Sequence, residues 1–274
     1  MTTIRLAIPV LAPLLLLGAC QKPPSNGAAA RQVFGNGMQW IDLTHSFSSQ
    51  TIYWPTAKPF TLEVVAAGRT PGGYYYSANN FSAAEHGGTH LDAPIHFAEG
   101  RRAADAIPVR QLIGPAAVVD VRDSAGWNPD YLVSVQDLQR WEAGYGRIED
   151  GAIVLLRTGW AQYWNERRRY LGTPKTGPAA VPELHFPGLD PDAARWLVRE
   201  RHISAIGLDT PSIDRGQSRD YQSHRVLFAA DIPAFENLGT LDALPHIGAY
   251  VIALPMKIGG GSGAPLRIVA AIPR

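Results

Sequence analysis

Apolar runs of strand length recur along the chain, separated by polar, Gly-rich or Pro-rich turns. Short runs rich in Val, Ile and Leu predict β-strands. Segments with helical spacing lie between them, so the pattern predicts an α/β fold with a mixed β core and flanking helices. The predicted strands are residues 39–43, 60–67, 115–121, 152–158, 203–209, 249–255 and 267–273.

Three segments between these strands carry helix signals. Residues 134–144 begin with Ser134 as a helix cap and place Asp137 three residues later, an acidic form of the capping box. Residues 190–202 begin with a capping aspartate and a proline at the first helical position. Residues 220–230 show a weaker helical pattern. Because β-rich sequence precedes the first clear helix, we expect a single α/β domain and not a regular Rossmann alternation.

Residues 1–19 have the layout of a secretory signal peptide, with one basic residue, an apolar run and small residues before a cysteine. The run is too short and too interrupted by proline to predict a transmembrane helix. The sequence LGAC looks like a lipobox, which predicts cleavage before Cys20 and lipid on its sulfur. An ordinary signal peptide is the alternative. Cys20 is the only cysteine, which favours the lipoprotein and excludes an internal disulfide.

Residues 20–37 combine this cysteine with the Pro, Gly, Ser and Ala of a flexible tether, and the folded domain is expected at 38–274. Several acyl chains on one cysteine give stable membrane anchoring. The residue after the cysteine is Gln21 and not an aspartate. In this the sequence resembles Gram-negative lipoproteins of the outer membrane. We therefore expect a periplasmic, lipid-anchored protein of a Gram-negative bacterium.

Composition and charge narrow the function classes. The chain is 46% hydrophobic and 18% charged, which suits a substantial core. Its formal net charge is +1, and no basic stripe stands out. Nucleic-acid binding through an electrostatic footprint is therefore excluded.

The segment AEHGGTHLDAPIHF, residues 84–97, holds three of the eight histidines. Two glycines and a proline disfavour a helix there. In a strand, His90 and Asp92 point to the same side, and a Gly-Gly turn can bring His86 beside them. The proline then ends the strand and leaves His96 apart. These ligands suit zinc, manganese or iron, whereas a polar loop with backbone-bonded histidines is the structural alternative.

The segment HGGTHLDAPIH fits the pattern H-x-G-T-H-x-D-x-P-x-H. It resembles the cyclase-like family of metal-dependent hydrolases, which includes bacterial kynurenine formamidases and isatin hydrolases. Further blocks resemble this family in the same order, among them IDLTH, LLRTGW, IGLDTPSID and HRVLFAADIPAFENL. The resemblance extends from about residue 38 to the C-terminus. It implies a domain of the swivelling β/β/α type and a homodimer.

The resemblance also implies the metal ligands. The ions are expected to be zinc or manganese, one or two in number, and Asp92 is the natural bridge if two are bound. Two of the ligands are distal to the motif, one on a predicted helix and one in a Pro-marked loop, and both can face a pocket. The five implied ligands are His86, His90, Asp92, His224 and Glu236.

The chemistry that follows is hydrolysis of a C–N amide bond by a metal-activated water. His96 is the candidate general base, or a further ligand. The expected partner is a small aryl formamide or cyclic amide, similar to N-formylkynurenine or isatin. Tyr53 and Trp54 are expected to stack on the substrate, with core packing as the alternative. Ser212 is expected to hydrogen-bond a substrate carbonyl, and GGGSG at 259–263 is expected to be a tight turn between strands.

Two other functions stay open at this point. One is a periplasmic metal-binding or solute-binding lipoprotein without catalysis, and the other is a cyclase or dehydratase with the same metal site. Location bears on the substrate, because kynurenine formation is expected in the cytoplasm. An exported hydrolase therefore favours an amide met outside the cytoplasm.

Overall fold

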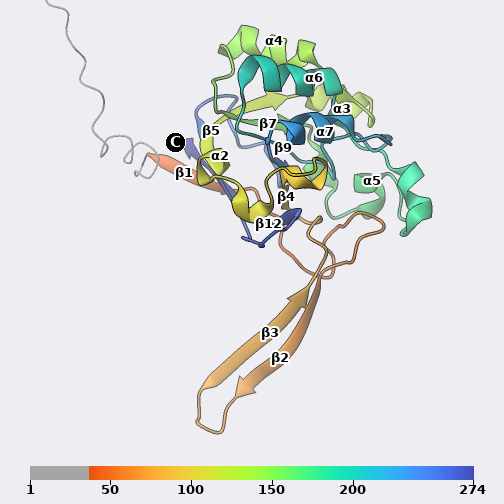
Figure 1. Cartoon of the computed structure of the whole chain (residues 1–274). Coiled ribbons are helices and arrows are strands. Elements are labelled where there is room, and N and C mark those ends of the chain that lie inside the picture. Colours follow the sequence, from red (N-terminus) through yellow and green to blue (C-terminus); the bar gives the residue numbers. More distant parts are fainter. Residues whose placement is uncertain (1–36) are drawn as a thin grey trace, which may run out of the picture.

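The computed structural model describes residues 37–274 (Figure 1). The expected signal peptide 1–19, the expected lipidation site Cys20 and nearly all of the expected tether 20–37 lie outside the described residues. Figure 1 shows a body with helices on one side of a sheet and a long hairpin projecting from the other side. Within 37–274, none of the helices has the length and hydropathy of a membrane-spanning segment.

Eight strands form one mixed sheet in the order β1-β12-β11-β5-β7-β9-β10-β4. Because β4 also pairs with β12, the seven strands other than β1 close into a ring. The run from β5 through β7 and β9 to β10 is parallel, and the other pairings are antiparallel. The strands are β1 (Met38–Asp42), β4 (His90–Asp92), β5 (Ile113–Asp120), β7 (Ile153–Arg157), β9 (Ala205–Leu208), β10 (Ala234–Glu236), β11 (Ala249–Pro255) and β12 (Gly263–Pro273), with β6 (Leu132–Val133) and β8 (Gly188–Leu189) in a separate pair.

The ring is apolar on both faces. Val118 of β5 and Leu155 of β7 belong to an interior cluster that draws residues from every ring strand. Their neighbours Val119 and Leu156 belong to an outer cluster that includes helix residues. Side chains alternate across a strand, so a strand covered on both faces needs an unbroken apolar run. The runs that predicted β5 and β7 supply this, and both predictions are confirmed.

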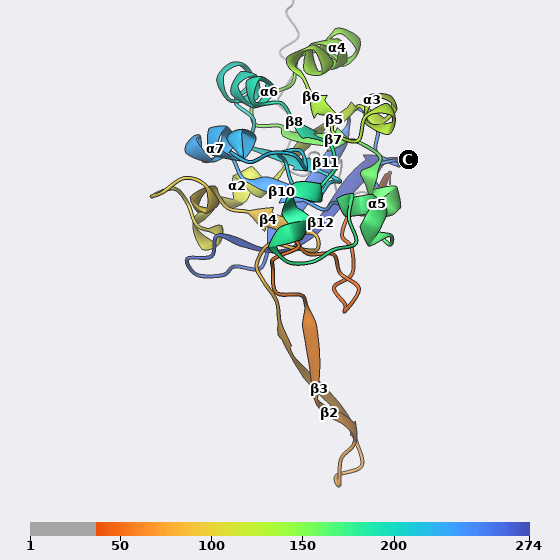
Figure 2. The same cartoon turned by 90° about the vertical axis from the view of Figure 1, so that its right-hand side faces the viewer.

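Helices α4, α6 and α7 cover the outer face of the ring (Figures 1 and 2). The predicted capping box is present, because Ser134 and Asp137 accept each other's backbone N–H groups. The helix predicted at 190–202 is α6 continued by a π-helical turn, and the one predicted at 220–230 is α7. The helices are α2 (Val109–Leu112), α3 (Arg122–Trp127), α4 (Val135–Tyr145), α5 (Arg167–Leu171), α6 (Pro191–Trp196), η5 (Leu197–Arg201) and α7 (Gln222–Ala229), with short 3₁₀ helices η1 (Pro94–His96), η2 (Ala104–Ala106), η3 (Trp160–Tyr163) and η4 (Pro178–Glu183).

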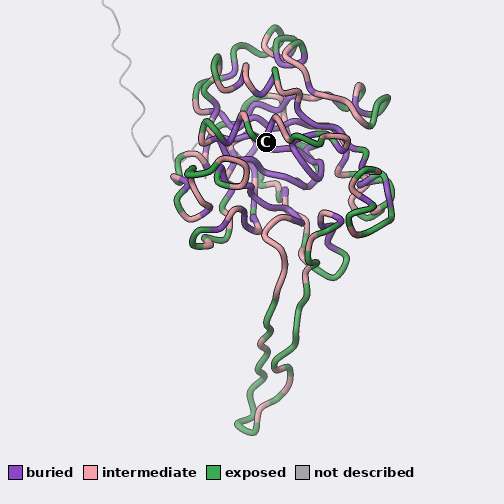
Figure 3. Tube along the Cα trace, turned by 45° about the vertical axis from the view of Figure 1, so that its right-hand side comes forward, coloured by how far each residue is buried: buried purple, intermediate pink, exposed green. Residues whose placement is uncertain are grey.

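Strands β2 (Thr61–Arg69) and β3 (Tyr75–Ser82) form a separate antiparallel hairpin, here called the hairpin arm (residues 61–82). It stands clear of the body, and most of its residues are exposed (Figure 3). The strand predicted at 60–67 is confirmed, but it lies on this arm and not in the core. A lone two-stranded hairpin is marginally stable in water, so a contact partner would stabilise the arm.

The expected single α/β domain with a mixed β core is confirmed. The structure shows a closed seven-stranded ring, which is a more specific arrangement than the predicted one. The swivelling β/β/α type stays a prediction. Ring closure also places β4, the strand of the histidine motif, between two partner strands. β10 places Glu236 opposite His90, and β12 places Gly263 opposite Asp92.

Candidate metal centre

The histidine-rich segment turns sharply before β4, and two glycines permit the turn. Gly87 and Gly88 have φ angles of +155° and +60°. A Cβ on Gly87 would overlap the Tyr53 ring, and one on Gly88 would come within 2.6 Å of the Phe47 ring. Glycine is therefore required at both positions. The turn brings His86 beside the strand, as the sequence predicted.

Asp92 lies at the centre of a cluster of histidines. Its Oδ1 atom is 2.7 Å from Nδ1 of His86 and 3.0 Å from Nε2 of His90. Its Oδ2 atom is 3.3 Å from Nε2 of His224 and 4.0 Å from Nε2 of His96. One buried carboxylate therefore faces four imidazoles, three from the motif and one from α7.

Glu236 supplies a second buried carboxylate. Its Oε1 atom is 3.2 Å from Nε2 of His224, and its Oε2 atom is 3.5 Å from Nε2 of His90. The backbone N–H of Ile213 donates to Oε1 at 2.8 Å and fixes the carboxylate. The prediction that Glu236 lies in a loop is wrong. Pro233 precedes strand β10 and does not interrupt it, so Glu236 lies in the strand. The predicted distal pair thus reaches the motif from a helix and a strand.

Two groups of side chains in the described chain place their ligand atoms close enough to hold cations. Asp92 belongs to both groups, which suits a bridging role. The sheet pairs Glu236 with His90, and His224 of α7 contacts both Asp92 and Glu236. The groups are His86, Asp92 and His96, and His90, Asp92 and Glu236, with the ligand atoms of each group within 4.8 Å of one another.

The donor set fits a divalent cation. Burial and the nearby charge of Asp92 raise the pKa of Glu236. Burial also acts to raise the pKa of Asp92, but the surrounding histidines, His86 foremost, hold that pKa well below its usual value. None of the described residues that line the site is Lys or Arg. Two buried carboxylates among imidazoles, with no Lys or Arg beside them, match the ligands of a divalent cation.

His96 differs from the other histidines of the cluster. Burial acts to lower the pKa values of His90 and His224, but their carboxylate partners outweigh it and raise both pKa values. For His96, burial dominates and lowers the pKa to about 4. Its side chain is 29% exposed, against 2% for Asp92, and stacks on the His86 ring at 3.9 Å. His96 therefore stands at the edge of the cluster, apart from its centre.

Groups outside the motif orient two of the histidines. Nδ1 of His224 donates to Oδ2 of Asp214 at 2.6 Å, and Nδ1 of His90 contacts the Gly88 carbonyl oxygen at 3.0 Å. Both arrangements leave Nε2 facing the carboxylates. Sequence reasoning gave Asp214 no such role. The feature of the sequence that could have pointed to this role of Asp214 is its position ten residues before His224.

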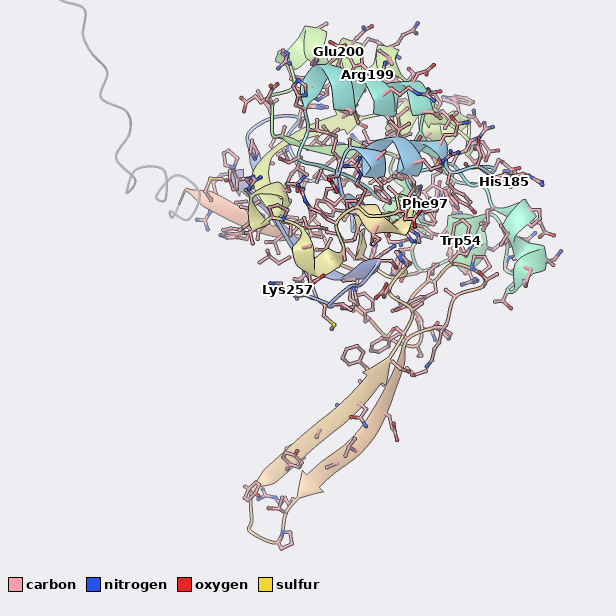
Figure 4. All side chains as sticks on the ribbon, in the orientation of Figure 1. Trp54, Phe97, His185, Arg199, Glu200 and Lys257 are labelled. Carbon is pink, nitrogen blue, oxygen red and sulfur yellow. The ribbon has the colours of Figure 1, made fainter. Side chains whose placement is uncertain are left out.

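A cavity of about 270 Å³ opens beside the cluster. The three residues predicted to bind substrate, Tyr53, Trp54 and Ser212, all line it. Sequence reasoning missed Phe97, which lines the same cavity and packs on the His224 ring at 4.6 Å. Figure 4 shows Trp54 and Phe97 on one side of the body, above the base of the hairpin arm.

The Tyr53 hydroxyl has no hydrogen-bond partner within the described part of the chain, although it is buried. Burial raises the Tyr53 pKa to about 12, so the hydroxyl stays protonated at neutral pH. A buried donor without a partner is unusual in a folded protein. Tyr53 lines the cavity, and its hydroxyl is a hydrogen-bond donor without a partner among the described residues.

Comparisons with known proteins agree with this geometry. The Cyclase family model matches residues 41–215. The chain is 32% identical over 210 residues to the isatin hydrolase of Roseibium aggregatum, a match that covers 74% of this chain and 77% of that protein. It is 28% identical over 232 residues to the kynurenine formamidase of Bacillus cereus, covering 84% and 96%.

A solved structure shares the fold over nearly the whole chain. Isatin hydrolase A from Ralstonia solanacearum matches with a TM-score of 0.80 and 33% identity, covering 92% of this chain and 98% of that chain. The histidine motif, the buried carboxylates and the family match over 41–215 point to the same conclusion. The chain belongs to the cyclase-like family of metal-dependent hydrolases.

Proposed function

We propose that the protein hydrolyses the C–N bond of a small neutral cyclic amide similar to isatin. The observation that carries this proposal is that the acid and histidine cluster lines the same cavity as several aromatic side chains. The relatives named isatin hydrolase and kynurenine formamidase support amide hydrolysis over binding without catalysis and over a cyclase or dehydratase reaction.

We propose zinc or manganese as the metal, one or two ions, held by the five residues that the sequence predicted. A bound divalent ion would supply Lewis acidity, which polarises a carbonyl group and makes water a better nucleophile near neutral pH. The protein's own contribution is to hold the imidazole and carboxylate atoms at fixed positions. Asp92 supplies a carboxylate oxygen to both ligand groups. The residues are His86, His90, Asp92, His224 and Glu236.

His96 is proposed as the general base. It lines the cavity and lies at the edge of the cluster, with its Nε2 atom 4.0 Å from Oδ2 of Asp92. From there its imidazole can take a proton from the attacking water and return it to the leaving nitrogen. The surrounding cluster fixes the ring by stacking it on His86.

The walls of the cavity support a flat, neutral substrate. Trp54 and Phe97 offer aromatic surface, and Tyr53 offers a hydroxyl donor for a carbonyl oxygen. Ser212 supplies a further polar group. N-formylkynurenine carries an amino-acid carboxylate, and no Lys or Arg lines the described cavity to bind it. We therefore place an isatin-like amide ahead of an aryl formamide, which is the second candidate.

The test is turnover. The purified protein, loaded with zinc or with manganese, is assayed against isatin and N-formylkynurenine. We expect hydrolysis of isatin with the higher kcat/KM. A protein that binds the metal but turns over neither compound supports the non-catalytic binding lipoprotein instead.

We keep periplasmic, outer-membrane lipid anchoring through Cys20 as a proposal that rests on the sequence alone. The signal-peptide layout and the lipobox-like LGAC support it. Metabolic labelling with a radioactive fatty acid tests it, since Cys20→Ser should abolish the label. Labelling that persists in this variant contradicts the anchor.

We also propose a homodimer formed through the hairpin arm. Directly opposed residues of a hairpin share a face, and the pairing sets Leu62 beside Phe81. Val64 is on the same face, since side chains two apart point to the same side. These three side chains are 54–64% exposed. The opposite face carries polar pairs such as Glu63 with Asn80.

A second copy is the occupant that these features favour. Glu63 and Arg69 are the charged residues of the arm, so it lacks the basic cluster that attracts anionic membranes. Strands β2 and β3 contribute 9 and 8 residues. A stable interface uses roughly 20–30 residues from each partner, so the arm would supply most of one partner's share and the rest would come from the body.

A further inference from the structure

His86 contacts a turn that the proposed reaction does not otherwise use. Its Nε2 atom lies 2.9 Å from Oγ of Ser262, and its Nδ1 atom lies 2.7 Å from Oδ1 of Asp92. Ser262 belongs to GGGSG (259–263), the predicted turn that leads from β11 into β12. The two ring nitrogens of His86 therefore face two different groups, one at the cluster and one behind it.

Glu85 determines the direction of the hydrogen bond between Ser262 and His86. The Ser262 hydroxyl donates to Oε2 of Glu85 at 2.6 Å. The same oxygen accepts the backbone N–H groups of Ser262 and Gly263, at 2.9 Å and 3.2 Å. An ionised carboxylate only accepts, so the hydroxyl hydrogen of Ser262 points at Glu85. The Ser262 oxygen is then free to accept from Nε2 of His86.

A donor at Nε2 fixes the tautomer of the ring. A neutral imidazole has a single N–H, so when a cation beside Asp92 takes the lone pair of His86 Nδ1, the hydrogen is on Nε2 and is donated to Ser262. His86, Asp92 and His96 form one of the two groups able to hold a cation. Metal-binding histidines usually donate their other ring N–H to an orienting group, which fixes the ring and strengthens the ligand.

The turn is held in place by contacts that do not involve the His86 ring. The backbone N–H of Ala93 donates to the Ser262 carbonyl oxygen at 2.9 Å. Gly263 pairs with Asp92 in the register of β12 and β4. A Cβ on Gly263 would come within 2.5 Å of Cε1 of His86, so glycine allows the close approach. Ser262 is therefore a fixed acceptor.

We infer that Glu85 and Ser262 are positioning residues that hold His86 in the tautomer whose Nδ1 faces the cation, and that they strengthen cation binding at Asp92. The inference rests on the proposed function, because it takes the cluster as a metal site. It adds a part of the chain far from the motif, the turn before β12, to the groups that set metal affinity.

The test measures Zn²⁺ affinity of the purified protein by competition with a chromophoric chelator. Ser262→Ala removes the acceptor for Nε2–H and should weaken Zn²⁺ binding by about 10- to 100-fold. Glu85→Gln keeps an acceptor oxygen but removes the charge, so it should weaken binding less. Ser262→Thr keeps the hydroxyl and should restore the affinity. Glu99→Gln, an exposed acid close to the motif, is the matched control and should bind as the wild type does.

A second readout reports the tautomer itself. In the Zn²⁺-loaded, ¹⁵N-histidine-labelled protein, long-range ¹H–¹⁵N spectra should show His86 protonated at Nε2, and Ser262→Ala should change this signal. Thermal unfolding of the metal-free variants separates a loss of fold from a loss of affinity.

The outcomes distinguish this inference from the proposed function. Wild-type affinity for Zn²⁺ in Ser262→Ala overturns the positioning role and leaves amide hydrolysis standing. The predicted losses of affinity without any amide turnover in the wild type support the positioning role and overturn the proposed reaction. A wild type that binds neither Zn²⁺ nor Mn²⁺ overturns both.

Discussion

Nε2 of His224 lies 3.3 Å from Oδ2 of Asp92, so helix α7 and strand β4 meet at a single carboxylate. The other oxygen of Asp92 faces two histidines of the motif. Because the residue belongs to both ligand groups, it has no substitute within the described cluster. The site is thus assembled by tertiary structure around one acid.

Asp92→Asn is predicted to abolish tight cation binding. Asparagine keeps the size of the side chain but loses the charge and one acceptor oxygen. The loss of affinity should exceed the roughly 10- to 100-fold that follows from removing a group that only orients a ligand. Calorimetric titration with Zn²⁺ measures it, and the exposed Asp123→Asn is the control. Near wild-type affinity in Asp92→Asn contradicts the shared-carboxylate site.

His96→Ala is predicted to retain the cation and lose catalysis. Removing a general base typically lowers the rate about 10²- to 10⁴-fold, so kcat should fall within this range. Metal content by elemental analysis should stay at the wild-type level. A parallel loss of metal would make His96 a ligand, whereas unchanged kcat would remove it from the reaction.

His45 is predicted to make the fold less stable in acid. It stacks on Trp164 at 4.0 Å, and burial lowers its pKa to about 4, against the opposing effect of a hydrogen bond with the Leu238 backbone. No charged side chain of the described chain contributes to this shift. As pH falls from about 6.5 to about 4, the unfolded chain takes up a proton that the folded chain does not, so stability should fall across this window.

The matched variant is His45→Phe, which keeps an aromatic ring against Trp164 but does not titrate. Its stability should depend less on pH between about 6.5 and about 4 than that of the wild type. Urea unfolding at pH 7 and at pH 5 measures the difference. Equal pH dependence in the two proteins would rule out His45 as the source.

Charge on the apolar face of the hairpin arm is predicted to separate the dimer. Leu62→Glu combined with Phe81→Glu should give a monomer by light scattering, because the two residues are neighbours on that face. Asn80→Glu, on the polar face, should leave the dimer intact. A wild type that is monomeric at micromolar concentration contradicts the dimer, and binding of the monomer to lipid vesicles would assign the arm to a membrane.

Local sequence rules were sufficient for the inner part of the site. Alternation in a strand places His90 and Asp92 together, and both lie buried at the cluster. The Gly-Gly pair predicts a backbone that only glycine adopts, which Gly87 and Gly88 show. These features depend on neighbours within a few residues, so the sequence contains the information for them.

The remaining features depend on contacts between distant segments. Ser262 reaches His86 because β12 pairs with β4, and a turn sequence does not specify that pairing. Glu236 is a ligand candidate because β10 lies on the other side of β4. The apolar run at 60–67 predicts a strand correctly, but alternation alone does not show that the strand leaves the body.

The most direct test of the central claim is metal-dependent hydrolysis of isatin. The protein is stripped with a chelator, reloaded with Zn²⁺ or Mn²⁺, and assayed by the loss of isatin absorbance alongside Asp92→Asn. We predict no turnover in the stripped protein, recovery on reloading, and none in the variant. Metal-loaded protein that binds its ion tightly yet hydrolyses neither isatin nor N-formylkynurenine would contradict the account.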